Sequence, residues 1–194
     1  YCNQSPFYRP TYSGSRMTGH PSKKIITDLY LAGKSQVAWT TLIADLETPV
    51  SAMLKLADGR PNSFLLESVE GGKVRGRFSI IGMNPDIIWK FKKKTAQINR
   101  RARMNENEFE TCPEEPLQSL RALVSESRIE LPEELPPMAS GLFGYMGYDS
   151  VRLNEDIPDN NPDDLMVPDG LFLRPTLICI FDRLKDIVTI VTPI

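Results

Sequence analysis

The fold is decided by the stretch FLLESVEGG at residues 64–72 together with RGRFSIIG at residues 75–82. An apolar run ends in an acid and a hydroxyl, a glycine turn follows, and a second apolar run begins with two arginines. This pattern predicts two adjacent strands that bring an acid, a hydroxyl and a guanidinium together beside apolar side chains. Such a set suits a free amino acid with an apolar side chain, because it offers an acceptor for the ammonium and a donor for the carboxylate.

Glu67 and Ser68 carry this hypothesis, and Glu67 also has a plainer interpretation. A carboxylate that is buried directly after three apolar residues costs several kcal/mol unless a cation or donors accompany it. Glu67 would then turn into solvent or pair with Arg75 or Arg77 across the hairpin. Arg77 lies closer to the apolar run and is expected to be structural, whereas Arg75 lies nearer the turn and is freer to meet a ligand.

Outward from this hairpin, the pattern predicts an α+β domain with largely antiparallel sheets, because strands dominate without regular β-α-β alternation. Strands are expected over residues 63–69, 77–81, 86–92, 95–99, 141–148, 171–181 and 187–192, and residues 37–46 suit a strand that leads into a short helix. Helices are expected at 49–57, where Thr48-Pro49 begins the helix and Asp58-Gly59 ends it, and at 116–128. Residues 102–114 and 154–168 are predicted loops.

Length and composition describe an ordinary globular protein of 194 residues, with 41% hydrophobic and 25% charged residues. Residues 1–23 form an expected irregular or disordered tail, and residues 24–194 form the domain, which is expected to continue past the last strand signal.

The net charge of −2 gives no reason to expect nucleic acid or an anionic membrane surface. The chain contains neither a membrane-length apolar run nor a signal peptide, and its three cysteines are widely spaced. A reducing, cytoplasmic location is therefore expected, with Cys179 as a buried thiol.

Known catalytic and metal-binding motifs are missing from the sequence, and the only imidazole, His20, lies in the expected tail. Gly141, Gly144 and Gly147 are separated by aromatic and apolar residues. This spacing favours a central strand against which another backbone or large side chains pack closely, rather than a phosphate-binding loop.

Several motifs occur in an order that resembles the amino-terminal region of anthranilate synthase component I, over about residues 25–194. These motifs are DxETPVS at 45–51, LLES at 65–68, GRFSxxG at 76–82, NP at 84–85, GxxGYxGYD at 141–149, PD at 168–169 and FD at 181–182. The resemblance implies a sandwich of antiparallel sheets with helices outside. It also implies the family's reaction, the first step of tryptophan biosynthesis, in which chorismate and glutamine give anthranilate, pyruvate and glutamate.

The resemblance further implies a set of ligands and partners. L-tryptophan inhibits the family by feedback, a glutamine amidotransferase subunit (component II) supplies ammonia, and Mg²⁺ is required. The catalytic residues and the Mg²⁺ ligands are expected in the carboxy-terminal chorismate-binding domain, so we predict no catalytic residue and no metal ligand in this chain. The residues expected to bind tryptophan are Leu66, Glu67, Ser68, Val69 and Arg75, and the supporting residues are Arg77, Pro168 and Asp169.

Three alternatives remain open from the sequence, and one of them is a purely structural α+β domain that binds no amino acid. The other two hold an amino acid. An aminodeoxychorismate synthase component I would hold tryptophan as a fixed structural ligand, although the acid before Ser68 favours the inhibited enzyme. A non-catalytic amino-acid-binding module would use the same residues without an attached enzyme domain. Both predict an amino-acid site around Glu67, so the site itself does not separate them.

Overall fold

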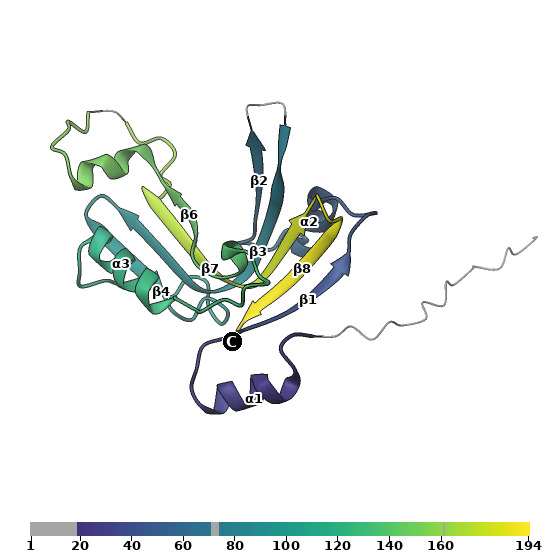
Figure 1. The fold of residues 1–194 in the computed structure, drawn as a ribbon. Helices are drawn as coiled ribbons and strands as arrows, with labels where there is room; N and C mark the ends of the chain where they lie inside the picture. The colour runs from purple at the N-terminus through teal and green to yellow at the C-terminus, as the bar shows by residue number, and fades with distance from the viewer. Residues whose placement is uncertain (1–18, 71–73, 161) are drawn as a thin grey trace, which may run out of the picture.

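In the described part of the chain, one curled sheet of eight antiparallel strands forms the centre (Figure 1). The computed structural model describes residues 19–70, 74–160 and 162–194. The strands are β1 (Val37–Ile43), β2 (Phe64–Glu70), β3 (Val74–Lys92), β4 (Thr95–Asn99), β5 (Glu110–Thr111), β6 (Phe143–Met146), β7 (Gly170–Asp182) and β8 (Ile187–Pro193). Their order is β1-β8-β7-β3-β4-β5, with β2 paired to β3 and β6 paired to β7.

Strands β3 and β7 are long and run side by side through both halves of the curled sheet (Figure 1). We call these halves its arms: one contains β1, β2 and β8, and the other contains β4, β5 and β6. The sequence predicted two strands, 77–81 and 86–92, where the structure has one strand of 19 residues. Pro85 lies opposite Pro175 of β7, and the register shifts between Pro85 and Ile87. Because proline donates no ladder hydrogen bond, the pair of prolines is accommodated at an irregularity instead of ending the strand. The α+β class and the antiparallel pairing are confirmed. The resemblance implied a sandwich of separate sheets, whereas the described strands form one continuous sheet with two arms.

Helix α2 (Pro49–Ala57) covers one face of the arm that contains β2, β8 and the first half of β3. It begins as predicted, because Thr48 accepts a hydrogen bond from Ser51 N at 3.1 Å and Ser51 Oγ accepts one from Thr48 N at 3.0 Å. It ends at Asp58 in the left-handed conformation, with φ of 44°. Beneath it lies a core of Ala52, Ile81, Met83, Cys179 and Phe181. Cys179 is buried as predicted, and its burial raises the pKa of the thiol to about 11.

Helix α3 (Pro116–Glu126) covers the other arm and matches the predicted helix at 116–128. Its Leu123 packs against Trp89 and Phe91 of β3. The indole N–H of Trp89, which is fully buried, donates to Ser119 Oγ at 2.9 Å. This bond satisfies a polar group inside the core and fixes α3 on the sheet.

Three features correct the predictions. Helix α1 (Lys23–Leu31) was not predicted, and none of its residues is buried. His20, which the sequence placed in the tail, exchanges two backbone hydrogen bonds of 2.7 Å with Trp39 and stacks on its ring. His20, within the expected tail, is therefore paired with β1, and residues 1–18 lie outside the described part. Strand β5 lies inside the predicted loop at 102–114.

The glycine-spaced strand β6 is confirmed as a strand, but it is not central. In the described part of the chain it pairs only with β7. A Cβ on Gly144 would lie 1.9 Å from the Leu171 carbonyl oxygen, so the close approach of two backbones is as predicted. After β6 the chain continues into the 3-10 helix η2 (Tyr148–Leu153), and the 3-10 helix η1 (Pro137–Ala139) precedes it.

The described helices are short. The longest of them, α3, has 11 residues, whereas a bilayer-spanning helix needs about 20. Within the described ranges, therefore, no helix could cross a membrane.

Candidate functional site

The ladder between β2 and β3 decides where Glu67 points. Leu65 lies opposite Ile81, and Glu67 lies opposite Ser79. Directly opposed residues share a face of the sheet. Leu65 packs with Ile81 into the core beneath α2. Glu67 therefore follows Leu65 on the α2 face, at the rim of that core, while Leu66 points to the opposite face and is 47% exposed.

Glu67 accepts hydrogen bonds from two groups, one on the neighbouring strand β3 and one in the turn that follows β7. Its Oε1 lies 2.6 Å from Arg183 Nη2 and 3.4 Å from Ser79 Oγ, and Arg183 Nη2 also donates to Ser79 Oγ at 3.1 Å. Ser79 is fully buried, whereas the side chains of Glu67 and Arg183 are 32% and 24% exposed. The partner of Glu67 is therefore Arg183, in the turn between β7 and β8, and not Arg77 as the plainer interpretation allowed.

Arg77 makes a separate, two-point ion pair with Asp182, the last residue of β7. Its Nε donates to Asp182 Oδ1 at 3.0 Å and its Nη2 donates to Oδ2 at 2.6 Å, while Leu184 N also donates to Oδ1 at 3.1 Å. Hydrogen bonds from Arg77 hold the pKa of the Asp182 carboxyl below its usual range, against the opposing effect of burial. Because Arg183 N donates to Arg77 O at 3.1 Å, this pair also fixes the turn that carries Arg183.

Ser68, Val69 and Arg75 belong to the predicted ligand set, but their side chains lie outside the described part of the structure. Their backbones are in the hairpin, where Val69 lies opposite Arg75 and the register shifts between Glu67 and Val69. The hydroxyl that lies beside Glu67 is that of Ser79. The roles predicted for these three side chains stay predictions.

Pro168 and Asp169, predicted as supporting residues, lie at the far end of β3. Asp169 Oδ2 accepts from Lys93 N at 2.6 Å, and Pro168 O accepts from Tyr145 OH at 3.0 Å. Lys92, whose Nζ lies 3.2 Å from Asp169 Oδ1, is 13 residues beyond Ser79 on β3 (79 to 92). At ~3.3 Å per residue, the strand path between the two is about 40 Å. The structure does not bring these residues to Glu67.

Glu67, Ser79 and Arg183, together with the adjacent pair of Arg77 and Asp182, form what we call the Glu67 cluster. The sequence did not lead us to expect three of its residues there: Ser79, Asp182 and Arg183. Ser79 and Asp182 stand in the motifs GRFSxxG and FD, which carried the resemblance, but no role was assigned to them. Arg183 follows Asp182 directly and lies in the turn predicted between two strong strands. A polar turn at the end of a strand that neighbours β3 was the available signal for this cluster.

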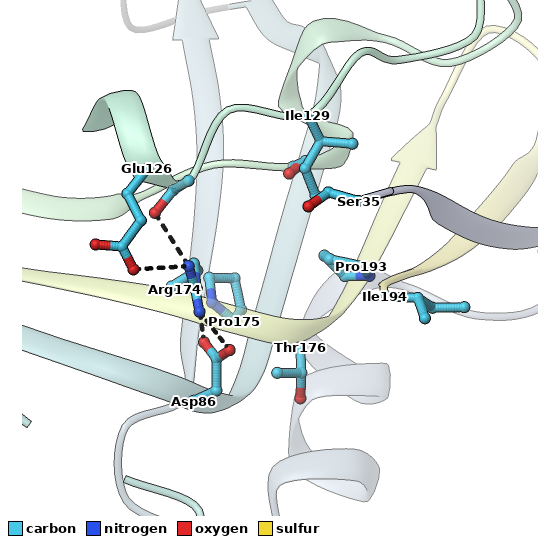
Figure 2. A pocket seen from close by; sticks show the side chains of 11 residues that line it. Ser35, Asp86, Glu126, Ile129, Arg174, Pro175, Thr176, Pro193 and Ile194 are labelled. Atoms are coloured by element: carbon cyan, nitrogen blue, oxygen red, sulfur yellow. Dashed lines mark hydrogen bonds and ion pairs between the residues drawn. The ribbon is translucent and has the colours of Figure 1, made fainter. Parts of the chain in front are cut away.

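A small cavity of about 130 Å³ lies elsewhere, where the bend of the sheet meets the end of α3 (Figure 2). Arg174 donates to both carboxylate oxygens of Asp86, at 2.9 and 2.7 Å, and to Ser127 Oγ at 3.4 Å. Glu126 Oε1 lies 3.9 Å from Arg174 Nη1. Each nitrogen of the guanidinium therefore has a partner within the protein. This ion-pair cluster ties α3 to β3 and β7 and is a structural feature.

Within residues 19–70, 74–160 and 162–194, no three His, Cys, Asp or Glu side chains gather where they could hold a metal ion. The described residues therefore do not fit a Mg²⁺ site, and we assign no step to Mg²⁺ in this chain.

Comparison with known proteins finds several relatives named anthranilate synthase component 1. The relative from Cereibacter sphaeroides is 51% identical over 162 residues, which are 84% of this chain and 32% of the relative. Those from Thermus thermophilus (42% over 153 residues, 79% and 31%) and Synechocystis sp. (36% over 170 residues, 85% and 32%) are similar in extent. The chain thus spans about a third of the length of the curated relatives that it matches.

The other comparisons add little. The crystal structure of anthranilate synthase component I from Streptococcus pneumoniae TIGR4 superposes with a TM-score of 0.48 at 25% identity, covering 76% of this chain and 29% of that chain. No protein-family model matches the chain.

Proposed function

The chain belongs to the anthranilate synthase component 1 family, and on that basis we propose that it supplies the regulatory, amino-terminal part of an anthranilate synthase large subunit. The complete protein would convert chorismate and glutamine into anthranilate, pyruvate and glutamate, in the first step of tryptophan biosynthesis. L-tryptophan would bind this part of the protein as the feedback inhibitor.

The observation that carries the proposal is the environment of Glu67 in the middle of β2. Arg183 and Ser79 hold one oxygen of its carboxylate at the rim of the core beneath α2. A carboxylate in a fixed position, beside a guanidinium and a buried hydroxyl, suits the charged end of an amino acid. Ser68 is the next residue of β2, and Arg75 lies across the hairpin from Val69. In this proposal Val69 and these two polar residues complete the ligand contacts, whereas Leu66, also expected from the sequence, lies on the opposite face of β2 from Glu67.

Regulation would work through a preference between two arrangements of the large subunit. Tryptophan bound near Glu67 and Ser68 would favour an arrangement that binds chorismate weakly. Couplings of this kind typically amount to ~1–3 kcal/mol, or about 5- to 150-fold in affinity.

The proposal also includes the partners of the complete protein. The chorismate-binding residues and the Mg²⁺ ligands would lie in the two thirds of the relatives that this chain does not match. A glutamine amidotransferase subunit, component II, would supply the ammonia, and the complex would work in the cytoplasm.

The experiment uses the full-length large subunit with its amidotransferase, and it follows anthranilate formation by fluorescence while L-tryptophan is titrated. Ser68→Phe should raise the half-inhibiting concentration about 5- to 150-fold, since overfilling a packed site costs about 1–3 kcal/mol. The uninhibited rate should stay within about twofold. Ser125→Phe, at an exposed position on α3, is the matched control and should change neither value.

Two outcomes would contradict the proposal. Unchanged inhibition in the Ser68→Phe protein would remove Ser68 from the tryptophan site. Formation of aminodeoxychorismate in place of anthranilate, identified by chromatography of the product, would show that the protein belongs to the related synthase, in which tryptophan is a structural ligand.

A further inference from the structure

A single hydrogen bond, from Arg183 Nη2 to Glu67 Oε1, joins the two residues of the Glu67–Arg183 ion pair. Nη2 of Arg183 donates to Glu67 Oε1 and to Ser79 Oγ. A guanidinium has five N–H donors, so three of them, on Nε and Nη1, remain after these two bonds. Among the residues that the structure describes, neither these donors nor Glu67 Oε2 has a hydrogen-bond partner. Unused donors and an unused acceptor thus lie side by side.

The neighbouring pair of Arg77 and Asp182 is different. Both oxygens of Asp182 accept bonds from Arg77, and Oδ1 also accepts one from Leu184 N. The side chain of Asp182 is only 9% exposed. Asp182 therefore has no unused oxygen for the ammonium of a ligand, although Arg77, which is 43% exposed, keeps three of its five N–H donors. Of the two pairs, Glu67–Arg183 is the one that has an unused acceptor beside unused donors.

We infer that Arg183 binds the carboxylate of the amino-acid ligand while Glu67 Oε2 accepts a hydrogen bond from its ammonium. The inference rests on the proposed function and adds a specificity-determining residue to it. It gives Arg183, in the turn between β7 and β8, a carboxylate-binding role, whereas from the sequence Arg75 was the arginine expected to meet the ligand.

The arrangement selects a zwitterion for an electrostatic reason. An α-amino acid carries its ammonium and its carboxylate on the same carbon, so both can reach adjacent partners at once. A simple amine would place its positive charge near Arg183 without a compensating carboxylate. A simple carboxylate would place its negative charge near Glu67. The ion pair therefore favours ligands that carry both charges over ligands that carry one.

The turn that carries Arg183 is held in place before any ligand binds. Arg183 N donates to Arg77 O, Leu184 N donates to Asp182, and the buried Ser79 Oγ accepts from the guanidinium. Each bond restricts the position of the Arg183 side chain or backbone. Binding then needs little ordering of the protein, which favours affinity.

The test compares three ligands on the full-length protein: L-tryptophan, tryptamine, which lacks the carboxylate, and indole-3-propionate, which lacks the ammonium. Binding is measured by calorimetry, and uninhibited anthranilate formation is recorded for every variant as a check of folding. Arg183→Met should weaken L-tryptophan about 5- to 20-fold, as expected for one charge-assisted hydrogen bond at a partly exposed site. It should leave tryptamine unchanged or bound more tightly.

Further variants separate the two charges. Glu67→Gln should weaken L-tryptophan and tryptamine, but leave indole-3-propionate unchanged or bound more tightly. Arg183→Lys keeps the positive charge and should retain the preference of the wild-type protein for L-tryptophan over tryptamine, which keeps the inference testable if Arg183→Met folds poorly. Arg121→Met, on the exposed side of α3, is the matched control and should alter no ligand.

Three results would count against the inference. Equal losses of L-tryptophan and tryptamine in Arg183→Met would mean that Arg183 is only structural. An unchanged affinity for L-tryptophan would place Arg183 outside the site. A wild-type protein that binds none of the three ligands would overturn the proposed function together with this inference, whereas the first two results overturn the inference alone.

Discussion

Replacing Gly144 by alanine tests how closely β6 approaches β7. A Cβ at this position would lie 1.9 Å from Leu171 O and 2.7 Å from Phe172 Cα. These are backbone atoms, so no side chain can turn away to make room. An ordinary contact needs at least about 3.4 Å, and β6 must therefore move away from β7 by about 1.5 Å at this point. A ladder hydrogen bond of about 2.9 Å would lengthen to about 4.4 Å and be lost.

The expected cost follows from two opposing terms. Overpacking typically costs about 1–3 kcal/mol, and an immovable backbone obstruction belongs at the upper end of that range. Alanine recovers about 0.5–1 kcal/mol by restricting the unfolded chain. We therefore expect Gly144→Ala to lower the free energy of unfolding by about 2 kcal/mol, which corresponds to roughly 4–8 °C in Tm for a chain of this size.

Urea unfolding followed by far-ultraviolet circular dichroism measures this difference, and hydrogen exchange of the β6 amides reports whether the loss is local. Gly19→Ala is the control, because a Cβ there would have no neighbour within 4 Å. It should change the free energy of unfolding by less than about 0.5 kcal/mol. A Gly144→Ala protein as stable as the wild type would refute the close approach of the two strands.

Two further predictions concern buried polar groups. Ser119→Ala should lower the free energy of unfolding by about 1–3 kcal/mol, because the N–H of the buried Trp89 loses its acceptor. Urea unfolding measures this loss. The loss should be smaller in a Trp89→Phe background, which has no such N–H. Asp182 has a lowered pKa in the folded state because Arg77 bonds to its ionised form. The ionised Asp182 therefore stabilises the fold fully above the pKa of the unfolded chain, about 3.9, and this stabilisation is lost as the pH falls through the pKa of the folded protein. The difference in free energy of unfolding between wild type and Asp182→Asn should therefore narrow from about pH 6 to about pH 3, and a difference that widens on acidification would contradict the assignment.

Elements with local chemical signals were predicted correctly. Thr48-Pro49 and Asp58-Gly59 mark the ends of α2, and alternating or continuous apolar runs mark β2, β7 and β8. These signals depend on neighbours in the sequence, such as a cap within one turn. Helix α1 was missed for the same reason, since a helix that buries no residue has no strong apolar face to detect.

The tertiary structure overrode local signals at Asn84 and Pro85. These residues lie in the gap between the predicted strands 77–81 and 86–92, yet β3 continues through them because β7 pairs along both halves. The position of β6 was likewise decided by partners. The glycine spacing correctly indicated a close backbone approach, but no local pattern states that β6 has one neighbouring strand in the described chain instead of two.

The orientation of Glu67 relative to Leu65 on β2 was determined by the sequence alone, because side chains alternate between faces along any strand. The partner of that acid was decided only by the tertiary structure. Arg183 stands 116 positions away along the chain from Glu67, and the two meet because β2, β3 and β7 pair in one register. Strand register is set by the burial of whole faces, which no short segment encodes.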